Sequence, residues 1–123
     1  MTIMEAIAAI DEIKPNGYSA DQKVAWLSTV DGMIYRQIIQ THKDDEGISW
    51  EGYNKDTPTE TVLLAEPPYD ELYQYWLQSK IEFANGEYAK YNNSAIRFND
   101  AYSNYRNYYN SQHAPKSTYI KFW

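Results

Sequence analysis

Hydrophobic residues recur at helical spacing in four segments of the chain. The first segment opens with Thr2 and, three residues later, Glu5, which is the spacing of a capping box at a helix N-terminus. Isoleucines then follow on one face through residues 3–10. The Lys-Pro-Asn-Gly sequence at 14–17 predicts the end of this short helix, because proline and glycine interrupt helices.

The second segment predicts a longer helix over residues 19–42. Ser19 is the expected N-cap, with Gln22 at the matching position three residues on. The Asp31-Gly32 pair weakens the helix locally by about 1 kcal/mol relative to alanine, so we expect a bend there rather than an end. The positions that form the inner stripe of this helix are Val24, Leu27, Val30 or Asp31, Ile34 and Ile38.

The third segment begins at the Pro-Pro-Tyr-Asp-Glu sequence of residues 67–71. Prolines outside or in the first turn and acidic residues near the positive end of the helix dipole are typical of a helix start. This pattern predicts a helix over 70–90. The Asn-Asn-Ser sequence at 92–94 predicts a break, with Ser94 as the cap of a fourth helix over 94–110. The expected inner face of the third helix consists of Leu72, Tyr75 or Trp76, Ser79 and Phe83, with Leu77 and Ile81 beside it.

The fourth segment carries a stripe of aromatic residues. The chain has 13 tyrosines in 123 residues. Alternate steps of four and three residues connect Tyr91, Ala95, Phe98, Tyr102, Tyr105 and Tyr109. This spacing keeps one side of a helix against a partner helix. Because each tyrosine hydroxyl needs a hydrogen-bond partner or water, the stripe suits a partly wet contact such as a subunit interface.

Two strand-like segments lie outside the helical pattern. Alternation at 48–53 and an apolar run at 62–64 predict a β-hairpin or extended arm within residues 44–66. The tail, residues 114–123, is also strand-like. It either adds an edge strand to the arm or docks on a neighbouring subunit. Because these segments are separate from the stripes that account for a core, the candidate assembly interface is Trp50, Tyr53, Tyr119, Ile120, Phe122 and Trp123.

The expected fold is therefore mainly α, a bundle of about four helices in a single domain over residues 1–123. The helical body covers residues 2–42 and 69–112, the β-hairpin or arm is inserted mid-chain, and the strand-like C-terminal tail follows. A chain of 14.4 kDa is long enough to bury one core without metal or disulfide.

Composition narrows the classes of function. The net charge of −6 argues against strong nucleic-acid binding, which depends on Lys and Arg neutralising phosphates. The chain has no cysteine, so disulfides and thiolate chemistry are excluded. No signal peptide and no apolar stretch near the roughly 20 residues of a membrane-spanning helix can be identified. We expect no membrane association.

The polar residues do not form a recognisable catalytic pattern. Residues 44–46 are three acidic residues in a polar turn, where a solvated charge run is the simpler interpretation. His42 and His113 each lie near a helix end, where a cation is a common stabiliser. Motifs for phosphate binding, zinc proteolysis or acyl transfer are absent from the sequence. We therefore expect a protein that is not an enzyme and that needs no cofactor or metal.

Several motifs spread over nearly the whole chain resemble a family of small proteins encoded among the structural genes of prophages of Gram-positive bacteria. These motifs are Ile-Asp-Glu-Ile-Lys-Pro-Asn at 10–16, Lys-Val-Ala-Trp-Leu-Ser at 23–28, Asp31-Gly32, Pro-Tyr-Asp-Glu-Leu-Tyr at 68–73, Ile-Glu-Phe-Ala-Asn-Gly-Glu-Tyr at 81–88, Tyr91-Asn92-Asn93 and Phe98-Asn99-x-Ala101-Tyr102. In size, helicity and gene context that family is similar to the head–tail connector (adaptor) proteins of tailed phages.

The resemblance implies a non-enzymatic virion assembly protein. Connector proteins form rings under the portal, with a helical bundle and extended segments that reach neighbouring subunits. The implied partners are further copies of the chain and other neck proteins, namely the portal and tail-completion proteins. The implied location is the virion, and the bacterial host cytoplasm during assembly. An alternative from another class is a binding module that recognises a host protein or carbohydrate through exposed Trp50 and Tyr53.

Overall fold

The computed structural model describes residues 1–42 and 49–113, and this part of the chain is mainly helical. Its elements are α1 (Ile3–Ile13), α2 (Ala20–Gln37), the short 3-10 helix η1 (Ile39–Thr41), α3 (Glu71–Asn85) and α4 (Tyr88–Gln112). The mainly α fold with four α-helices is therefore confirmed within the described residues.

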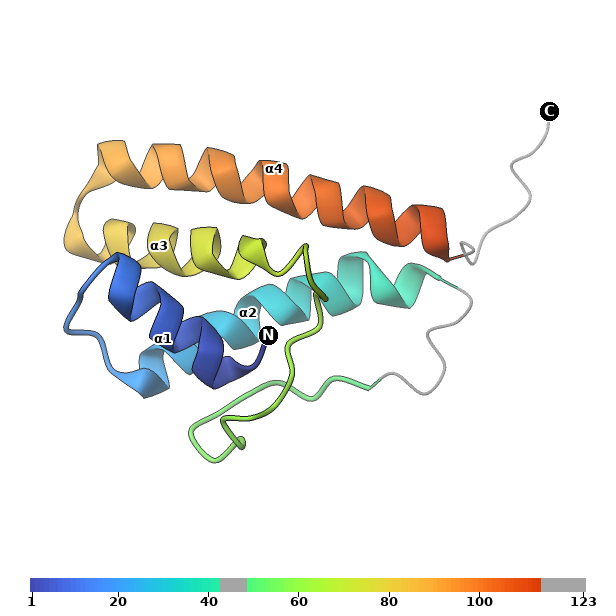
Figure 1. Cartoon of the computed structure of the whole chain (residues 1–123), viewed down its shortest axis with the longest axis horizontal. Coiled ribbons are helices and arrows are strands. Elements are labelled where there is room, and N and C mark those ends of the chain that lie inside the picture. The colour runs from blue at the N-terminus through green and yellow to red at the C-terminus, as the bar shows by residue number, and fades with distance from the viewer. Residues whose placement is uncertain (43–48, 114–123) are drawn as a thin grey trace.

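Helix α3 lies at the centre of the fold. It pairs with α4 as an antiparallel hairpin along one side, while α1 and α2 pack on its other side (Figure 1). One connected hydrophobic core joins all four helices. The buried stripe of α2 is the expected one, because Val24, Leu27, Val30, Ile34 and Ile38 are all buried. The helix also continues through Asp31-Gly32 without ending.

The helix starts at Thr2 and Ser19 follow the expected capping chemistry. The Thr2 hydroxyl accepts the Glu5 backbone N–H, and the Glu5 carboxylate accepts the Thr2 backbone N–H at 2.8 Å, which confirms the capping box. The Ser19 hydroxyl accepts the N–H of Gln22 at 3.1 Å. Both signals are local in sequence, and both are present in the fold.

The boundary between the third and fourth helices differs from the prediction. Helix α3 ends at Asn85, because Gly86 adopts a left-handed conformation with φ of 78° that terminates the helix. Helix α4 then runs without a break through residues 92–94. The expected cap at Ser94 was wrong: its side chain is buried inside the helix pair and donates a hydrogen bond to Glu82. That contact satisfies the hydroxyl within a continuous helix.

The predicted inner face of α3 was only partly right. Leu72 and Ser79 are buried, but Phe83 is 55 % exposed. Leu77 and Ile81, expected beside the face, are fully buried. A helix that contacts partners on several sides buries more than one stripe, so a single amphipathic face underestimates its core.

The tyrosine stripe of α4 packs inside this chain. Its buried members are Phe98, Tyr102, Tyr105 and Tyr109. They lie against α3 and the end of α2, and the Tyr102 hydroxyl donates to the Gln37 side chain at 2.7 Å. These four residues of the stripe are therefore part of the monomer's own core, whereas Tyr91 and Ala95 are half-buried.

The β-hairpin expected within 44–66 was wrong for the residues that the structure describes, 49–66. This part contains no strand, only an isolated bridge between Thr2 and Val62. Within the segment the backbone bonds are short-range turns, from Thr57 to Asn54 and from Thr61 to Pro58, and its longer-range backbone bonds go to the start of α1. The N–H of Ile3 donates to Thr61, that of Met4 donates to Thr59, and that of Leu63 donates to Met1. An extended segment whose hydrogen bonds go to a helix N-terminus has no need of a second strand.

The strand-like tail lies outside the described residues, and so do Tyr119, Ile120, Phe122 and Trp123. Among the described helices, none combines the length and the apolar character that crossing a membrane requires.

Candidate functional site

Trp50 and Tyr53, the two candidate interface residues within the described part, pack on α2 of the same chain. A Cβ atom at Gly32 would lie only 2.9 Å from Cη2 of Trp50, so the indole rests directly on the glycine. The Trp50 ring also stacks on Tyr35, with ring centroids 6.4 Å apart, and meets Tyr53 edge-on at 6.0 Å. Both residues are half-buried, so each keeps only part of its surface for a partner.

The Tyr53 hydroxyl belongs to a hydrogen-bond network centred on a buried carboxylate. Asp31 has 0 % exposure. One of its oxygens accepts the Tyr53 hydroxyl at 2.6 Å and the backbone N–H of Leu64 at 3.1 Å. The other oxygen accepts the Tyr73 hydroxyl at 2.6 Å, and Tyr73 in turn accepts the N–H of Ala65 at 2.8 Å. The network therefore fastens the extended segment to α2 and α3.

Burial sets the electrostatics of this network. It raises the pKa of the Asp31 carboxyl, although the hydrogen bonds from Tyr53, Tyr73 and Leu64 oppose the shift. The pKa values of the Tyr53 and Tyr73 hydroxyls also rise, first through burial and then through the nearby Asp31 charge. Such a carboxyl resembles a catalytic base, but its oxygens are already occupied by fixed donors. Its role in the described structure is to position the chain.

Two hollows flank the Trp50 ring. One, with a volume of about 440 Å³, lies against α2 beside Gly32, Met33 and Arg36. The other, of about 320 Å³, lies along the extended segment beside Tyr53 and Val62. Tyr35 stacks on the Trp50 ring, so part of the indole surface on which a sugar could pack is already occupied.

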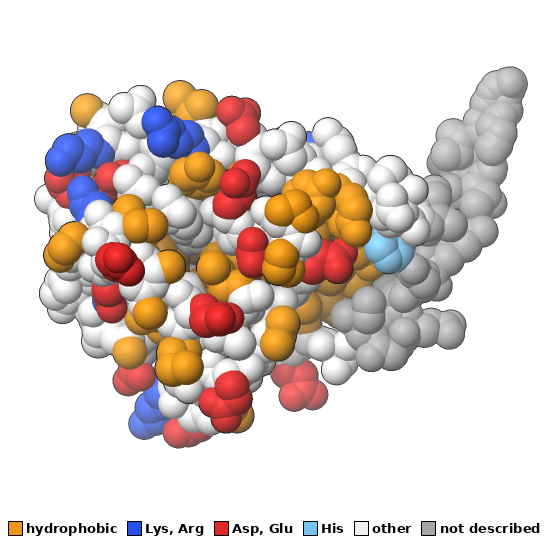
Figure 2. Space-filling view, viewed as in Figure 1, with side chains coloured by type: hydrophobic (Ala, Val, Ile, Leu, Met, Phe, Trp, Pro, Cys, Tyr) orange, Lys and Arg blue, Asp and Glu red, His pale blue; other side chains and the backbone are white. Residues whose placement is uncertain are grey.

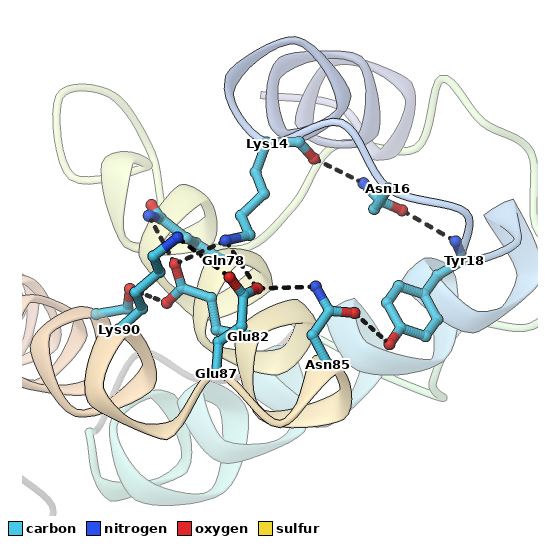
Figure 3. Close-up of polar contacts among 9 residues, drawn as sticks. Lys14, Asn16, Tyr18, Gln78, Glu82, Asn85, Glu87 and Lys90 are labelled. Carbon is cyan, nitrogen blue, oxygen red and sulfur yellow. Dashed lines mark hydrogen bonds and ion pairs between the residues drawn. The ribbon is translucent and has the colours of Figure 1, made fainter.

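A second polar cluster joins the end of α1 to the α3–α4 turn (Figure 3). Glu82, only 2 % exposed, accepts hydrogen bonds from Ser94 and from Gln78, the latter at 3.2 Å. Lys14 reaches the same carboxylate at 3.4 Å and Glu87 at 3.0 Å. The cluster cannot be recognised from the sequence, because Lys14 lies 68 residues from Glu82 along the chain.

The charges in this cluster act on one another. Hydrogen bonds from Asn85, Lys14 and Lys90 lower the pKa of Glu87 to about 2. The hydrogen bond to Glu87 raises the pKa of Lys14, with Glu82 adding to the effect. Lys14 is therefore charged at neutral pH and fixed in place. A cavity of about 350 Å³ opens beside it between α1, α3 and α4.

The two histidines come together at the far end of α4. The rings of His42 and His113 have centroids 6.0 Å apart, and Tyr109 packs against both, at 4.8 Å and 3.8 Å respectively. His42 Nδ1 lies 2.6 Å from the carbonyl oxygen of Ile38, and His113 Nδ1 lies 3.0 Å from that of Tyr109. Within residues 1–42 and 49–113, no group of three or more His, Cys, Asp or Glu side chains is arranged to hold a metal ion.

Comparison of the chain with protein-family models, with curated proteins and with solved structures finds no match.

Proposed function

We propose that the protein is a non-enzymatic virion assembly protein, of the head–tail connector type, that associates with copies of itself and with the portal or other neck proteins. The observation that carries the proposal is the sequence resemblance described above, which extends over nearly the whole chain. The structure supplies supporting arguments, because it indicates what the resembling residues do.

Several resembling residues build the framework of the fold. Asp31 and Tyr73 form the buried network, Gly86 ends α3 in a left-handed conformation, and Lys14 bridges to Glu82. Residues with such specific positions are expected to recur among proteins that share a fold. This supports a common architecture with the prophage family, from which the assembly function is proposed.

The surface also supports association with other proteins. The α3–α4 turn carries Phe83 and Tyr88, 55 % and 59 % exposed, whose rings lie 5.5 Å apart. Tyr91, which is half-buried, lies 5.1 Å from Phe83 and borders this exposed pair. Grouped exposed aromatics are typical of contact surfaces, because they bury large area at low entropic cost. Trp50, Tyr53 and the tail residues 119–123 stay candidates for further contacts.

The test is deletion of the gene from the prophage, followed by induction and examination of the particles. A connector joins heads to tails, so we expect heads and free tails to accumulate separately. Expression of the intact chain in trans should restore joined particles, and mass spectrometry of purified virions should detect it. Normal virions from the deletion strain, or absence of the protein from purified virions, would rule out the proposal.

A shorter chain tests the tail. Deletion of residues 118–123 should leave helical content and melting temperature nearly unchanged while abolishing incorporation into particles. If the truncated chain unfolds, the tail belongs to the monomer's own fold and the predicted interface there is wrong.

A further inference from the structure

The cavity between α1, α3 and α4 is lined by cationic side chains. Three cations line it, one from each of three places: Lys14 at the end of α1, and Lys90 and Arg97 one and three turns into α4. Figure 2 shows Lys and Arg side chains gathered over the N-terminal half of α4, whereas acidic side chains are spread over much of the same face. The chain as a whole carries a net charge of −6.

The positive charge in the cavity is only partly compensated. Glu82 and Glu87 are the carboxylates that bind Lys14 and Lys90. Within this group two carboxylates oppose three cations, which leaves one positive charge on the cavity side; Glu71 and Asp100 line a separate hollow that Arg97 also borders. Among the described residues Arg97 has no ion-pair partner, and it is one of the residues that line the cavity. A guanidinium carries five donors in a fork that fits a carboxylate, so this one remains available for a ligand.

The cavity is also fixed in shape. Lys14 is only 17 % exposed, and Glu82 and Glu87 hold it from two sides, as Figure 3 shows. Glu82 is itself held by Ser94 and Gln78. A ligand that enters therefore meets donors that are already ordered, so less side-chain entropy is lost on binding.

We propose that this cavity binds a carboxylate-bearing side chain of an acidic segment in a partner protein. A volume of about 350 Å³ has room for one or two side chains and lies at the low end of the range for ligand pockets. Ile13, 50 % exposed, forms an apolar part of the wall on which the methylene groups of a glutamate can pack. Its carboxylate would then meet Arg97 and the side-chain amide of Asn93. This proposal does not depend on the assembly function.

The surroundings limit the direction from which the acidic segment approaches. On its other side Arg97 faces a hollow lined by Glu71 and Asp100, which would repel a second carboxylate. The acidic segment is therefore expected to lie over Lys14 and Lys90, the cationic side of Arg97. Nucleic acid is the weaker fit, because a polyphosphate would also have to cross the acidic surface beyond the cavity.

The test uses the full chain labelled with ¹⁵N and titrated with a blocked tetraglutamate peptide, with tetraglutamine as the uncharged control. Saturable shifts of the backbone amides of Asn93, Ser94 and Arg97 are expected with the glutamate peptide only, with a Kd of about 1 mM or tighter. Arg97→Gln should weaken binding about fivefold, the scale of one partly exposed charge pair. Lys90→Gln, at a side chain 66 % exposed, provides a second variant that is not expected to disturb folding.

Arg106→Gln is the matched control, because it removes the same charge from an exposed position of α4 outside the cavity. Equal weakening by Arg106→Gln and Arg97→Gln would overturn the proposal, since binding would then follow net charge alone. Absence of saturable shifts would also overturn it. Inorganic phosphate and a single-stranded oligonucleotide are titrated in parallel. If either shifts the same amides at lower concentration than the peptide does, the site is a phosphate site and the carboxylate assignment is wrong.

Discussion

Replacement of Asp31 tests whether the buried network organises the fold. In Asp31→Ala, the hydroxyls of Tyr53 and Tyr73 and the N–H of Leu64 all lose their acceptor. Each buried donor left without a partner lowers the stability by about 1–3 kcal/mol, and part of this loss is recovered if water enters the site and accepts a hydrogen bond. We expect a total of about 3–5 kcal/mol, as for removal of one member of a buried charged network. That is a large share of a typical domain stability of about 5–15 kcal/mol.

Asp31→Asn should be much less harmful. The amide oxygen can take the position that accepts both Tyr53 and Leu64, and the amide NH₂ can donate to the Tyr73 hydroxyl. The Tyr73 O–H then loses its acceptor and its oxygen gains a weaker donor, while the cost of burying a charge disappears. We expect a loss of about 1 kcal/mol. Asp100→Ala, an exposed position on α4, is the control and should change stability by less than about 0.5 kcal/mol.

The assay is urea unfolding followed by far-UV circular dichroism. With a urea m-value of about 1–3 kcal/mol/M, Asp31→Ala should lower the midpoint by more than about 1 M. Local opening of residues 49–65 can be followed by amide hydrogen exchange at Leu64 and Ala65, whose N–H groups donate to Asp31 and Tyr73 in the network. If Asp31→Ala costs less than about 1 kcal/mol, the network does not organise this segment and the reasoning is refuted.

The pH dependence has a defined sign. Burial raises the pKa of Asp31 in the folded protein, so the folded state holds this proton more tightly than the unfolded state. The associated stability is fully present below the unfolded pKa and is lost as the pH rises through the folded pKa. The stability of the parent chain relative to Asp31→Asn should therefore increase as the pH falls from neutral through the raised pKa. A decrease over that interval would mean that the three donors outweigh burial.

Two further changes test the helix pair. Gly86→Ala should destabilise the protein by about 1 kcal/mol or more in a thermal melt, because φ is 78° at this position although the space around a new Cβ is open. Gly17→Ala is the control. The space there is equally open and φ is not positive, so this substitution should be close to neutral. Glu82→Ala should lower the free energy of unfolding by about 2–3 kcal/mol, since it leaves Lys14 and Ser94 without their buried acceptor. Ser94→Ala should lower it by about 1 kcal/mol. Equal effects of the two substitutions would contradict this order.

The sequence predicted those features that depend on residues close together in the chain. The caps at Thr2 and Ser19 each use a partner three residues away, and the stripe of α2 follows from helical spacing. The Asp31 network could not be found in this way, because Tyr73 lies 42 residues from Asp31 along the chain. One signal was present nonetheless. Asp31 occupies an inward position between Leu27 and Ile34, where a carboxylate needs buried partners.

The predicted hairpin failed for a related reason. Alternation at 48–53 indicates an extended backbone, but the pattern does not identify the hydrogen-bond partner, and residues 49–53 form no strand. Here the partners are the N-terminal turn of α1 and the side chains of Ser28 and Asp31. Likewise the helix predicted over 70–90 ends at Asn85, because Gly86 adopts a left-handed φ. The tyrosine stripe was expected to suit a partly wet subunit interface, but within one chain α4 already has a long contact with α3, where most of the stripe packs.

The two buried carboxylates also bear on how a partner could be bound. Asp31 fastens Tyr53 and the extended segment to the helices, and Glu82 fastens α1 to the α3–α4 turn. A partner that uses Trp50 and Tyr53 fully would have to disturb the Asp31 network, so its binding would be coupled to the stability of this segment. A partner at Phe83 and Tyr88 meets side chains that are already exposed and needs no such change. Of these two surfaces, the α3–α4 turn is therefore the one at which a partner could bind without loss of folding stability. Contacts at Trp50 are expected to depend on Asp31.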